Sequence, residues 1–319
     1  MNTTEQAIKD FISYCKFEKN LSSKTLKAYQ IDLTQFKYFL YSKYSISELS
    51  AITKIELRGF LEHLSTMKPK TIKRKIATLK CMFNFLEFED RILINPIRKT
   101  RIKIKEPKVL PKVMTLAEIL KIMKCAYRKF DLMSSNKSHP YFESLRDVVI
   151  LELLFSTGGR VSEIAELNEK QIDLKTGNLV LKGKGDKERV IQICSQETLN
   201  ILKTYVEIAA EKIKKANGAF LINRFGKQLS DQSIRNMVRK FSVKAKINRN
   251  ITPHVFRHTF ATLLLEKDVD IKYIQSLLGH SSIMTTQLYT HVNRRKQRKI
   301  LTTKHPRMGI SFRSVSSPE

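Results

Sequence analysis

The first part of the chain, residues 1 to about 90, carries apolar side chains at steps of three and four residues, the spacing of helices that bury one face. Ser22 and Ser23 can cap one such helix, whose apolar positions are Leu26, Tyr29, Leu33, Phe36 and Leu40. The segment KPKTIKRKIATLK continues the pattern, with apolar positions at Ile72, Ile76, Leu79, Phe83 and Leu86. This spacing predicts an all-helical N-terminal domain over residues 1–97.

Basic side chains occupy other positions of the second of these helices. Lys73, Arg74 and Lys75 fall between its apolar positions, so the pattern places them on an outer face. A basic helix face can lie along the phosphates of a nucleic acid, but such a face is often merely solvated. We interpret the three residues as candidate DNA contacts and keep a solvated face as the alternative.

Helical periodicity stops in the segment INPIRKTRIKIKEPKVLPK, which is rich in prolines and basic residues. We interpret residues 98–114 as a domain linker. Thr115 and Glu118 then form the capping-box pattern that opens a new helix. A second, larger domain is therefore predicted over residues 115–307, followed by a flexible tail at 308–319.

Three short runs in this second domain have the character of β-strands, namely QIDL, NLVLK and ERVIQIC. The last two flank GKGDK, a glycine-rich connector suited to a hairpin. In the later helical segment SDQSIRNMVRKF, Arg235 and Arg239 lie away from the apolar positions and are further candidate DNA contacts. The whole pattern predicts a mainly α protein, with a mixed α/β second domain that contains a small three-stranded antiparallel sheet.

Charge narrows the class of partner. The chain has 59 Lys and Arg residues against 30 Asp and Glu, a formal net charge of +29. Such a charge repels itself unless a polyanion neutralises it, so nucleic acid is the favoured partner, although a general enrichment in lysine explains part of the excess. The cysteines lack metal-binding spacing, and we find neither a secretion signal nor an apolar run that could cross a membrane. We therefore expect a cytoplasmic protein with reduced thiols.

Two motifs combine an arginine with a helix boundary. In TGGR, an apolar helix ends at a glycine turn, which leaves the guanidinium of Arg160 accessible. In TPHVFRH, a new helix begins on which His254 and Arg257 are three residues apart and point to one side. A guanidinium can hold two oxygens of one phosphate. The alternatives are that Arg160 only pairs with Glu163 and that His254 is structural.

Two further segments carry candidate chemistry. Lys184 lies in the connector between two predicted strands, where a glycine-flanked loop can bring an amine into a groove, and Lys187 is a rival for the same role. Gly279 is a plausible helix C-cap, which puts His280 just past a helix end. Tyr289 follows in a short amphipathic run, where a tyrosine usually belongs to a core.

In this order, TGGR, GKGDKER, HVFRH and LGHSSIMTTQLYTH resemble the motifs of the tyrosine recombinase, or lambda-integrase-like, family, and the later KHPR looks like its Xer-type bacterial members. The resemblance is strong from Thr157 to Arg307, and LSSKTLKAYQIDLTQFKYFL is similar to the SAM-like core-binding domain of the family. This sequence departs from the family in two places. Gly159 stands where members often carry a bulky apolar residue, and the loop near residues 127–145 is longer than in compact members.

The resemblance implies a role for each matched side chain. Arg160 and Arg257 would clamp the scissile phosphate, with His254 and His280 as supporting imidazoles. Lys184 would be the lysine of the sheet, and Tyr289 would be the nucleophile that forms a covalent 3′-phosphotyrosine. The departing 5′ oxygen needs a proton, for which Lys184 is the first candidate. Since the covalent link keeps the energy of the broken bond, this chemistry implies no cofactor, no metal and no ATP.

The same resemblance implies partners and a location. We expect a bacterial site-specific recombinase that acts as a tetramer on double-stranded DNA with an inverted-repeat core site, in the cytoplasm and associated with the nucleoid. The segment NRRKQRKILTTKHPR would dock on a neighbouring protomer, which argues against the first alternative, a type IB-like topoisomerase. The second alternative is a non-catalytic DNA-binding protein on the same scaffold, which the intact residue set makes less favoured.

Overall fold

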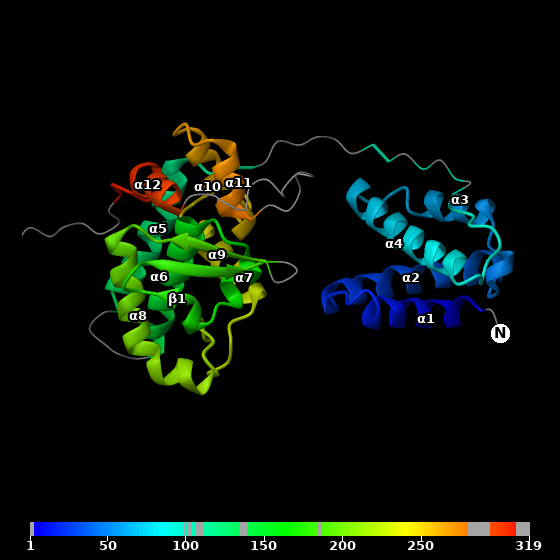
Figure 1. Cartoon of the computed structure of the whole chain (residues 1–319), viewed down its shortest axis with the longest axis horizontal. Coiled ribbons are helices and arrows are strands. Elements are labelled where there is room, and N and C mark those ends of the chain that lie inside the picture. The colour runs from blue at the N-terminus through cyan, green and yellow to red at the C-terminus, as the bar shows by residue number, and fades with distance from the viewer. Residues whose placement is uncertain are drawn as a thin grey trace, which may run out of the picture. The chain divides into compact units, whose positions relative to one another are not determined.

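A computed structural model describes residues 3–98, 100, 102, 104–105, 112–133, 139–183, 187–279 and 294–310. The chain divides into two compact units, Met1–Val109 and Leu110–Glu319, which we call the N-terminal and C-terminal units (Figure 1). Each has its own hydrophobic core. In the described residues, no helix combines the length and the apolar character that crossing a membrane requires.

The N-terminal unit is helical throughout its described residues, as the periodicity predicted. Three of its helices begin at hydroxyl-bearing caps, with the side chains of Thr3, Ser22 and Thr53 each accepting a backbone N–H of the first turn. Its elements are α1 (Thr4–Phe17), α2 (Ser23–Tyr44), the short 3-10 helix η1 (Leu49–Ala51), α3 (Lys54–His63) and α4 (Pro69–Phe88).

Aromatic side chains fill the core between these helices. The ring of Phe36 on α2 meets those of Phe60 on α3 and Phe83 on α4 edge to face, at centroid distances of 5.0 and 6.3 Å. Most of the positions predicted to face inward are buried: Leu33, Phe36, Leu40, Ile76, Leu79, Phe83 and Leu86. The apolar stripe read from the sequence therefore identifies the packing faces of α2 and α4.

The predicted outer face of α4 is wrong at one residue. Lys75 is only 3% exposed, and its amine donates to the carboxylate of Asp32 on α2 at 3.0 Å. A buried ammonium needs such a partner, because leaving water costs several kcal/mol. Lys75 thus lies between the helices and is not a candidate DNA contact, whereas Lys73 is exposed and Arg74 is 47% exposed at the side chain.

The C-terminal unit is built around α6, whose residues Leu145 to Phe155 are buried all round. Helices α5, α8 and α10 pack against it (Figure 1). The predicted capping box opens α5, with Thr115 and Glu118 bonded reciprocally. The helices are α5 (Leu116–Asp131), α6 (His139–Thr157), α7 (Val161–Ala165), η2 (Glu169–Gln171), α8 (Gln196–Lys215), α9 (Asp231–Lys244), α10 (Pro253–Leu265), α11 (Ile271–Leu278) and α12 (Arg294–Lys304).

The loop expected near residues 127–145 is shorter than the sequence suggested. Helix α5 continues to Asp131 and α6 starts at His139, so the connection spans only residues 132–138. Its middle, residues 134–138, lies outside the described residues. Helical periodicity on both sides was hidden by the polar run SSNKSHPY.

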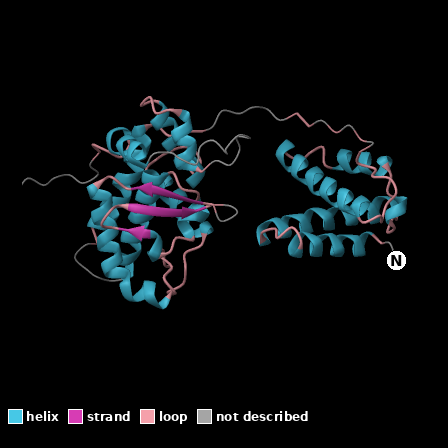
Figure 2. Ribbon diagram, in the orientation of Figure 1, coloured by secondary structure: helices cyan, strands magenta, loops and turns pink. Residues whose placement is uncertain are grey.

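The three predicted strands form the expected antiparallel sheet in the order β1-β2-β3 (Figure 2). They are β1 (Ile172–Asp173), β2 (Asn178–Lys182) and β3 (Glu188–Gln192). Leu179, Leu181 and Ile191 are buried at alternating positions. Gly183 donates its N–H to the carbonyl of Lys187 at 2.8 Å, which closes the β2–β3 hairpin at the base of the connector.

The residues after α12 pack into the core of the C-terminal unit. His305 donates its Nε2–H to the carbonyl of Ser156 at 2.7 Å, because its Nδ1 accepts the backbone N–H of Arg307. The guanidinium of Arg307 is 1% exposed and pairs with Glu152, which is fully buried in α6. This part of the segment predicted to dock on a neighbouring protomer is therefore anchored within its own unit.

Candidate active site

The turn between α6 and α7 presents Arg160, as the TGGR motif predicted. Gly158 has φ +59, and a Cβ there would lie 2.6 Å from a ring carbon of Phe260, so only glycine fits. A Cβ on Gly159 would lie 2.9 Å from Cδ1 of Ile164. The Ile164 side chain thus fills the space beside Gly159, which explains how the chain tolerates a glycine where relatives were expected to carry a bulky residue.

A buried carboxylate, Glu163 on α7, holds the arginine in place. Its side chain is 2% exposed. One oxygen accepts Nη1 of Arg160 at 2.7 Å, and the other accepts the backbone N–H of Arg160 at 2.8 Å. Arg189 on β3 donates to both oxygens, at 2.9 and 2.6 Å. Burial alone would raise the pKa of Glu163, but these bonds outweigh it and lower the pKa below the ordinary value.

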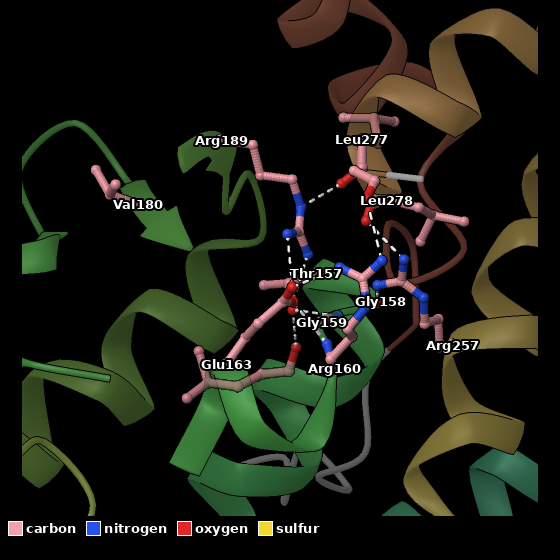
Figure 3. A network of polar contacts seen from close by, with 12 residues as sticks. Thr157, Gly158, Gly159, Arg160, Glu163, Val180, Arg189, Arg257, Leu277 and Leu278 are labelled. Carbon is pink, nitrogen blue, oxygen red and sulfur yellow. Dashed lines mark hydrogen bonds and ion pairs between the residues drawn. The ribbon is translucent and has the colours of Figure 1, made fainter. Parts of the chain in front are cut away.

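Three arginines bind the three consecutive carbonyls at the end of α11 (Figure 3). Nε of Arg189 donates to the carbonyl of Leu277 at 2.8 Å, Nη2 of Arg257 to that of Leu278 at 2.6 Å, and Nη2 of Arg160 to that of Gly279 at 3.0 Å. These carbonyls are the negative end of the helix dipole and lack intrahelical partners. The arrangement fixes the last turn of α11 against the α6–α7 turn.

Arg257 is the most deeply buried of the three, at 4% exposure. Its Nη1 also donates to the carbonyl of Gly158 at 2.9 Å, so it joins α10 to the α6–α7 turn as well as to α11. Burial, and then the charges of Arg160 and Arg189, lower the pKa of Arg257 to about 10. Three guanidiniums and one carboxylate leave an excess of positive charge at this site, which favours an anion.

His254 lies one turn before Arg257 on α10, as the HVFRH spacing predicted, and it is exposed. Although His254 is exposed on one side, protein atoms on the other side partly desolvate its ring. This desolvation, followed by the charges of His258, Arg257, Arg235 and Arg160, lowers the pKa of His254 below its ordinary 6.5. The imidazole is therefore neutral at neutral pH. Gly279 caps α11 in the left-handed region, also as predicted.

Three predicted site residues, Lys184, His280 and Tyr289, lie outside the described residues. Of the predicted DNA contacts on α9, Arg239 is exposed and Arg235 pairs with Asp231 at 3.3 Å. The sequence interpretation missed Arg189 and treated Glu163 only as a surface partner. A signal existed, because Arg189 lies two residues before Ile191 and therefore on the same inward face of its strand, where an arginine needs a buried carboxylate.

Comparison with known proteins identifies this arrangement. Residues 112–296 match the phage integrase family, and residues 8–90 match the phage integrase N-terminal SAM-like domain. A tyrosine recombinase of Agathobacter rectalis is 44% identical over 98% of this chain and 100% of its own length. Tyrosine recombinase XerC of Thermodesulfovibrio yellowstonii is 36% identical over 96% of this chain and 98% of its own length.

Solved structures share the fold. XerH recombinase bound to its difH substrate superposes with a TM-score of 0.67 at 23% identity, over 93% of this chain and 84% of its own. A lambda integrase dimer bound to a COC′ core site gives 0.66 at 21% identity, over 88% and 75%. The chain therefore belongs to the phage integrase family. It is a tyrosine recombinase, an enzyme of site-specific DNA recombination, and the topoisomerase alternative is not favoured.

Proposed function

We propose that this recombinase cleaves DNA through Tyr289, with Arg160 and Arg257 binding the scissile phosphate and His254 and His280 supporting it. The observation that carries the proposal is the convergence of Arg160 and Arg257 on the end of α11. The chain runs from this point directly into His280 and on to Tyr289. Phosphate-binding groups and nucleophile are thus joined by one short stretch of chain.

The charges suit the reaction. A phosphodiester anion gains charge on its non-bridging oxygens in the transition state, and preorganised cations stabilise that charge most. The bonds described above use only some of the N–H groups of Arg160, whose side chain is 30% exposed, so donors remain for a phosphate. A neutral His254 can donate one further hydrogen bond without repelling the two guanidiniums.

Cleavage exchanges one phosphoester bond for another. Tyr289 gives its phenolic proton to water, its oxygen forms a bond to phosphorus, and the bond from phosphorus to the 5′ oxygen breaks. Lys184 gives a proton to that oxygen, with Lys187 as the rival donor. The 3′-phosphotyrosine keeps the energy of the original bond, so a 5′ hydroxyl of a partner strand can reverse the step and complete the exchange.

Assembly and DNA contacts extend the proposal. A tetramer of lambda integrase has been solved on a Holliday junction, and we assign a tetramer on an inverted-repeat DNA site to this chain. Lys73, Arg74, Arg235 and Arg239 would contact phosphates. We keep docking on a neighbouring protomer as a role of the C-terminal segment NRRKQRKILTTKHPR, through residues other than His305 and Arg307, which are anchored in their own unit. The protein would work in the cytoplasm, on the nucleoid.

The test is Tyr289→Phe on a nicked suicide substrate, which traps the covalent complex for a denaturing gel. The variant should bind DNA as the wild type does and form no adduct, since only the hydroxyl is lost. Tyr273→Phe, the same change on α11, is the control and should keep forming the adduct. An adduct formed by Tyr289→Phe would assign the nucleophile to another residue.

A further inference from the structure

We propose that Arg189 is a positioning residue for strand cleavage: it ties the end of α11 to Glu163 and thereby aligns Arg160 with the segment that carries the nucleophile. This inference rests on the proposed function, because it assumes that Arg160 binds the phosphate and that Tyr289 attacks it.

Arg189 is held by three hydrogen bonds. Its side chain is 11% exposed, and all three guanidinium nitrogens donate within the protein. Nη1 and Nη2 form a fork on the two oxygens of Glu163, while Nε donates to the carbonyl of Leu277 (Figure 3). One planar group therefore joins strand β3, helix α7 and the last turn of α11.

Packing adds to these bonds. Gly279 has φ +62, and a Cβ built on it would lie 3.1 Å from Cδ and 3.2 Å from Nη1 of Arg189. The arginine side chain thus lies directly against the left-handed turn that ends α11. A residue with a side chain at Gly279 would push on Arg189, so the glycine serves both the backbone conformation and this contact.

Arg189 differs from the other two arginines in what it must do during the reaction. The bond from Arg160 to the Gly279 carbonyl is exposed, and Arg160 has to turn donors toward a phosphate. Arg189 has its fork on Glu163 and its third nitrogen on α11, so it holds both while Arg160 engages the substrate. It acts on the phosphate only through Glu163 and Arg160, and on the nucleophile only through α11.

The residue type follows from this geometry. A lysine would keep the positive charge near Glu163, but a single ammonium cannot reproduce the fork on a carboxylate together with a directed bond to a carbonyl. A purely electrostatic role predicts that Arg189→Lys retains activity. A positioning role predicts that it does not.

The experiment uses the full-length protein and compares Arg189→Lys with Lys182→Gln. Lys182 belongs to the same sheet and forms an exposed cross-strand pair with Glu188, so its loss should leave cleavage unchanged. For Arg189→Lys, single-turnover cleavage at saturating DNA should fall about 100-fold, the typical result of a small misplacement of reacting groups. DNA affinity should stay at its wild-type value, and the variant should remain folded at the assay temperature, with a modest fall in the unfolding midpoint from the lost buried hydrogen bonds.

Two readouts separate positioning from other roles. Sulfur in place of the bridging 5′ oxygen should restore cleavage by Lys184→Ala, because a thiolate leaves without a proton, and should not restore Arg189→Lys. In a double-mutant cycle with Glu163→Gln, the double variant should cleave no more slowly than the slower single variant, because both changes break one linkage.

Several results would overturn the inference. Wild-type cleavage by Arg189→Lys would do so, as would additive losses in the cycle or rescue by sulfur. Loss of DNA affinity with unchanged chemistry would make Arg189 a DNA contact, and a collapse of stability in both Arg189→Lys and Arg189→Gln would make it a folding residue. If the wild type itself forms no adduct at Tyr289 in the same assay, the proposed function fails instead.

Discussion

Two buried carboxylates, Asp32 in the N-terminal unit and Glu163 in the C-terminal unit, each bind two basic side chains, yet they serve different ends. Asp32 is 1% exposed and accepts Lys75, Arg74 and the hydroxyl of Thr78, all from the neighbouring helix α4. Glu163 is 2% exposed and accepts arginines that reach on to the carbonyls of α11. The Asp32 carboxylate joins two helices, whereas the Glu163 carboxylate orients two guanidiniums toward the end of α11.

The difference lies in where the remaining donors of each cation point. The Lys75 amine also donates to the side chain of Gln35 on α2, so its charge is neutralised and enclosed within the helix pair. At the second site, Arg160 is bound to Glu163 but its side chain stays 30% exposed, so donors remain for a substrate. Arg257 beside it is not bound to Glu163 and donates to two carbonyl oxygens, which do not neutralise its charge. A basic residue paired with a buried acid thus has either a structural role or a substrate-binding role. The role depends on whether it keeps hydrogen-bond donors that can reach a substrate.

The largest effect should be a loss of stability from breaking the buried pair of Asp32 and Lys75. Asp32→Asn leaves the buried Lys75 amine without its counter-charge, which typically costs about 3 to 5 kcal/mol. We expect that loss in the unfolding free energy of the N-terminal unit, measured by urea denaturation, with cleavage of bound DNA unchanged. Glu5→Gln is the control, because the Glu5 carboxylate is 57% exposed and its pairs with Lys9 and Lys37 contribute little. Equal losses for the two variants would erase the distinction.

Changing Arg257 should instead lower the rate of DNA cleavage. Arg257→Lys cannot hold the carbonyls of Gly158 and Leu278 while also facing a phosphate, so cleavage of a suicide substrate should fall about 100 to 1,000-fold. DNA affinity should change little. The matched control is Arg224→Lys, the same substitution at an exposed loop position of the same unit. Undiminished cleavage by Arg257→Lys would mean that the comparison assigns the wrong arginine to the phosphate.

Glu152 on α6 is a third buried carboxylate, and it pairs with Arg307. Arg307 and His305, which bonds to the Ser156 carbonyl, anchor the C-terminal segment there. Burial, opposed by the bond to Ser156 and reinforced by the charge of Arg307, lowers the pKa of His305 from 6.5 to about 4. Between pH 6.5 and pH 4, His305 is therefore protonated in the unfolded chain and neutral in the folded one. The stability that neutral His305 contributes to the fold is fully present above pH 6.5 and is lost as the pH falls toward 4.

That loss should reach about 3 kcal/mol, since each pKa unit corresponds to about 1.4 kcal/mol. Unfolding free energies of the C-terminal unit between pH 7 and pH 4 would measure it. His305→Gln should be less stable than the wild type at pH 7, and the gap should close as pH falls. His139→Gln, at the exposed start of α6, should follow the wild-type curve. A gap that stays constant with pH would show that His305 does not titrate in this way.

The sequence predicted most of the fold because helix and strand periodicity depends on local burial. It placed the faces of α2 and α4, the sheet, the cap at Thr115 and the arginine turn. It misplaced Lys75, although Lys75 stands three residues after Ile72 and four before Leu79, in the apolar register, and Asp32 occupies the matching register of α2. Opposite charges on facing apolar stripes were the missed signal.

The site was predicted less completely than the fold. Motifs predicted Arg160, His254 and Arg257 as site residues. Arg189 and Glu163 make contacts across 26 residues of chain, and no local pattern reports which side chains meet. His305 and Arg307 were recognised only as part of a motif, because their partners Ser156 and Glu152 lie about half the chain away. Long-range polar pairing is decided by tertiary packing, which a single sequence expresses only indirectly.

The smallest expected effect concerns DNA binding by α4 and tests the correction at Lys75 directly. If exposed Lys73 neutralises one phosphate, Lys73→Ala should reduce the slope of log affinity against log salt by about 0.9, through one fewer released counterion. Lys75→Met should leave the slope unchanged, because its amine is buried on Asp32. Titration of a short duplex at several salt concentrations measures both slopes. An equal reduction by the two variants would return Lys75 to the DNA-binding face, and no reduction by either would make that face merely solvated.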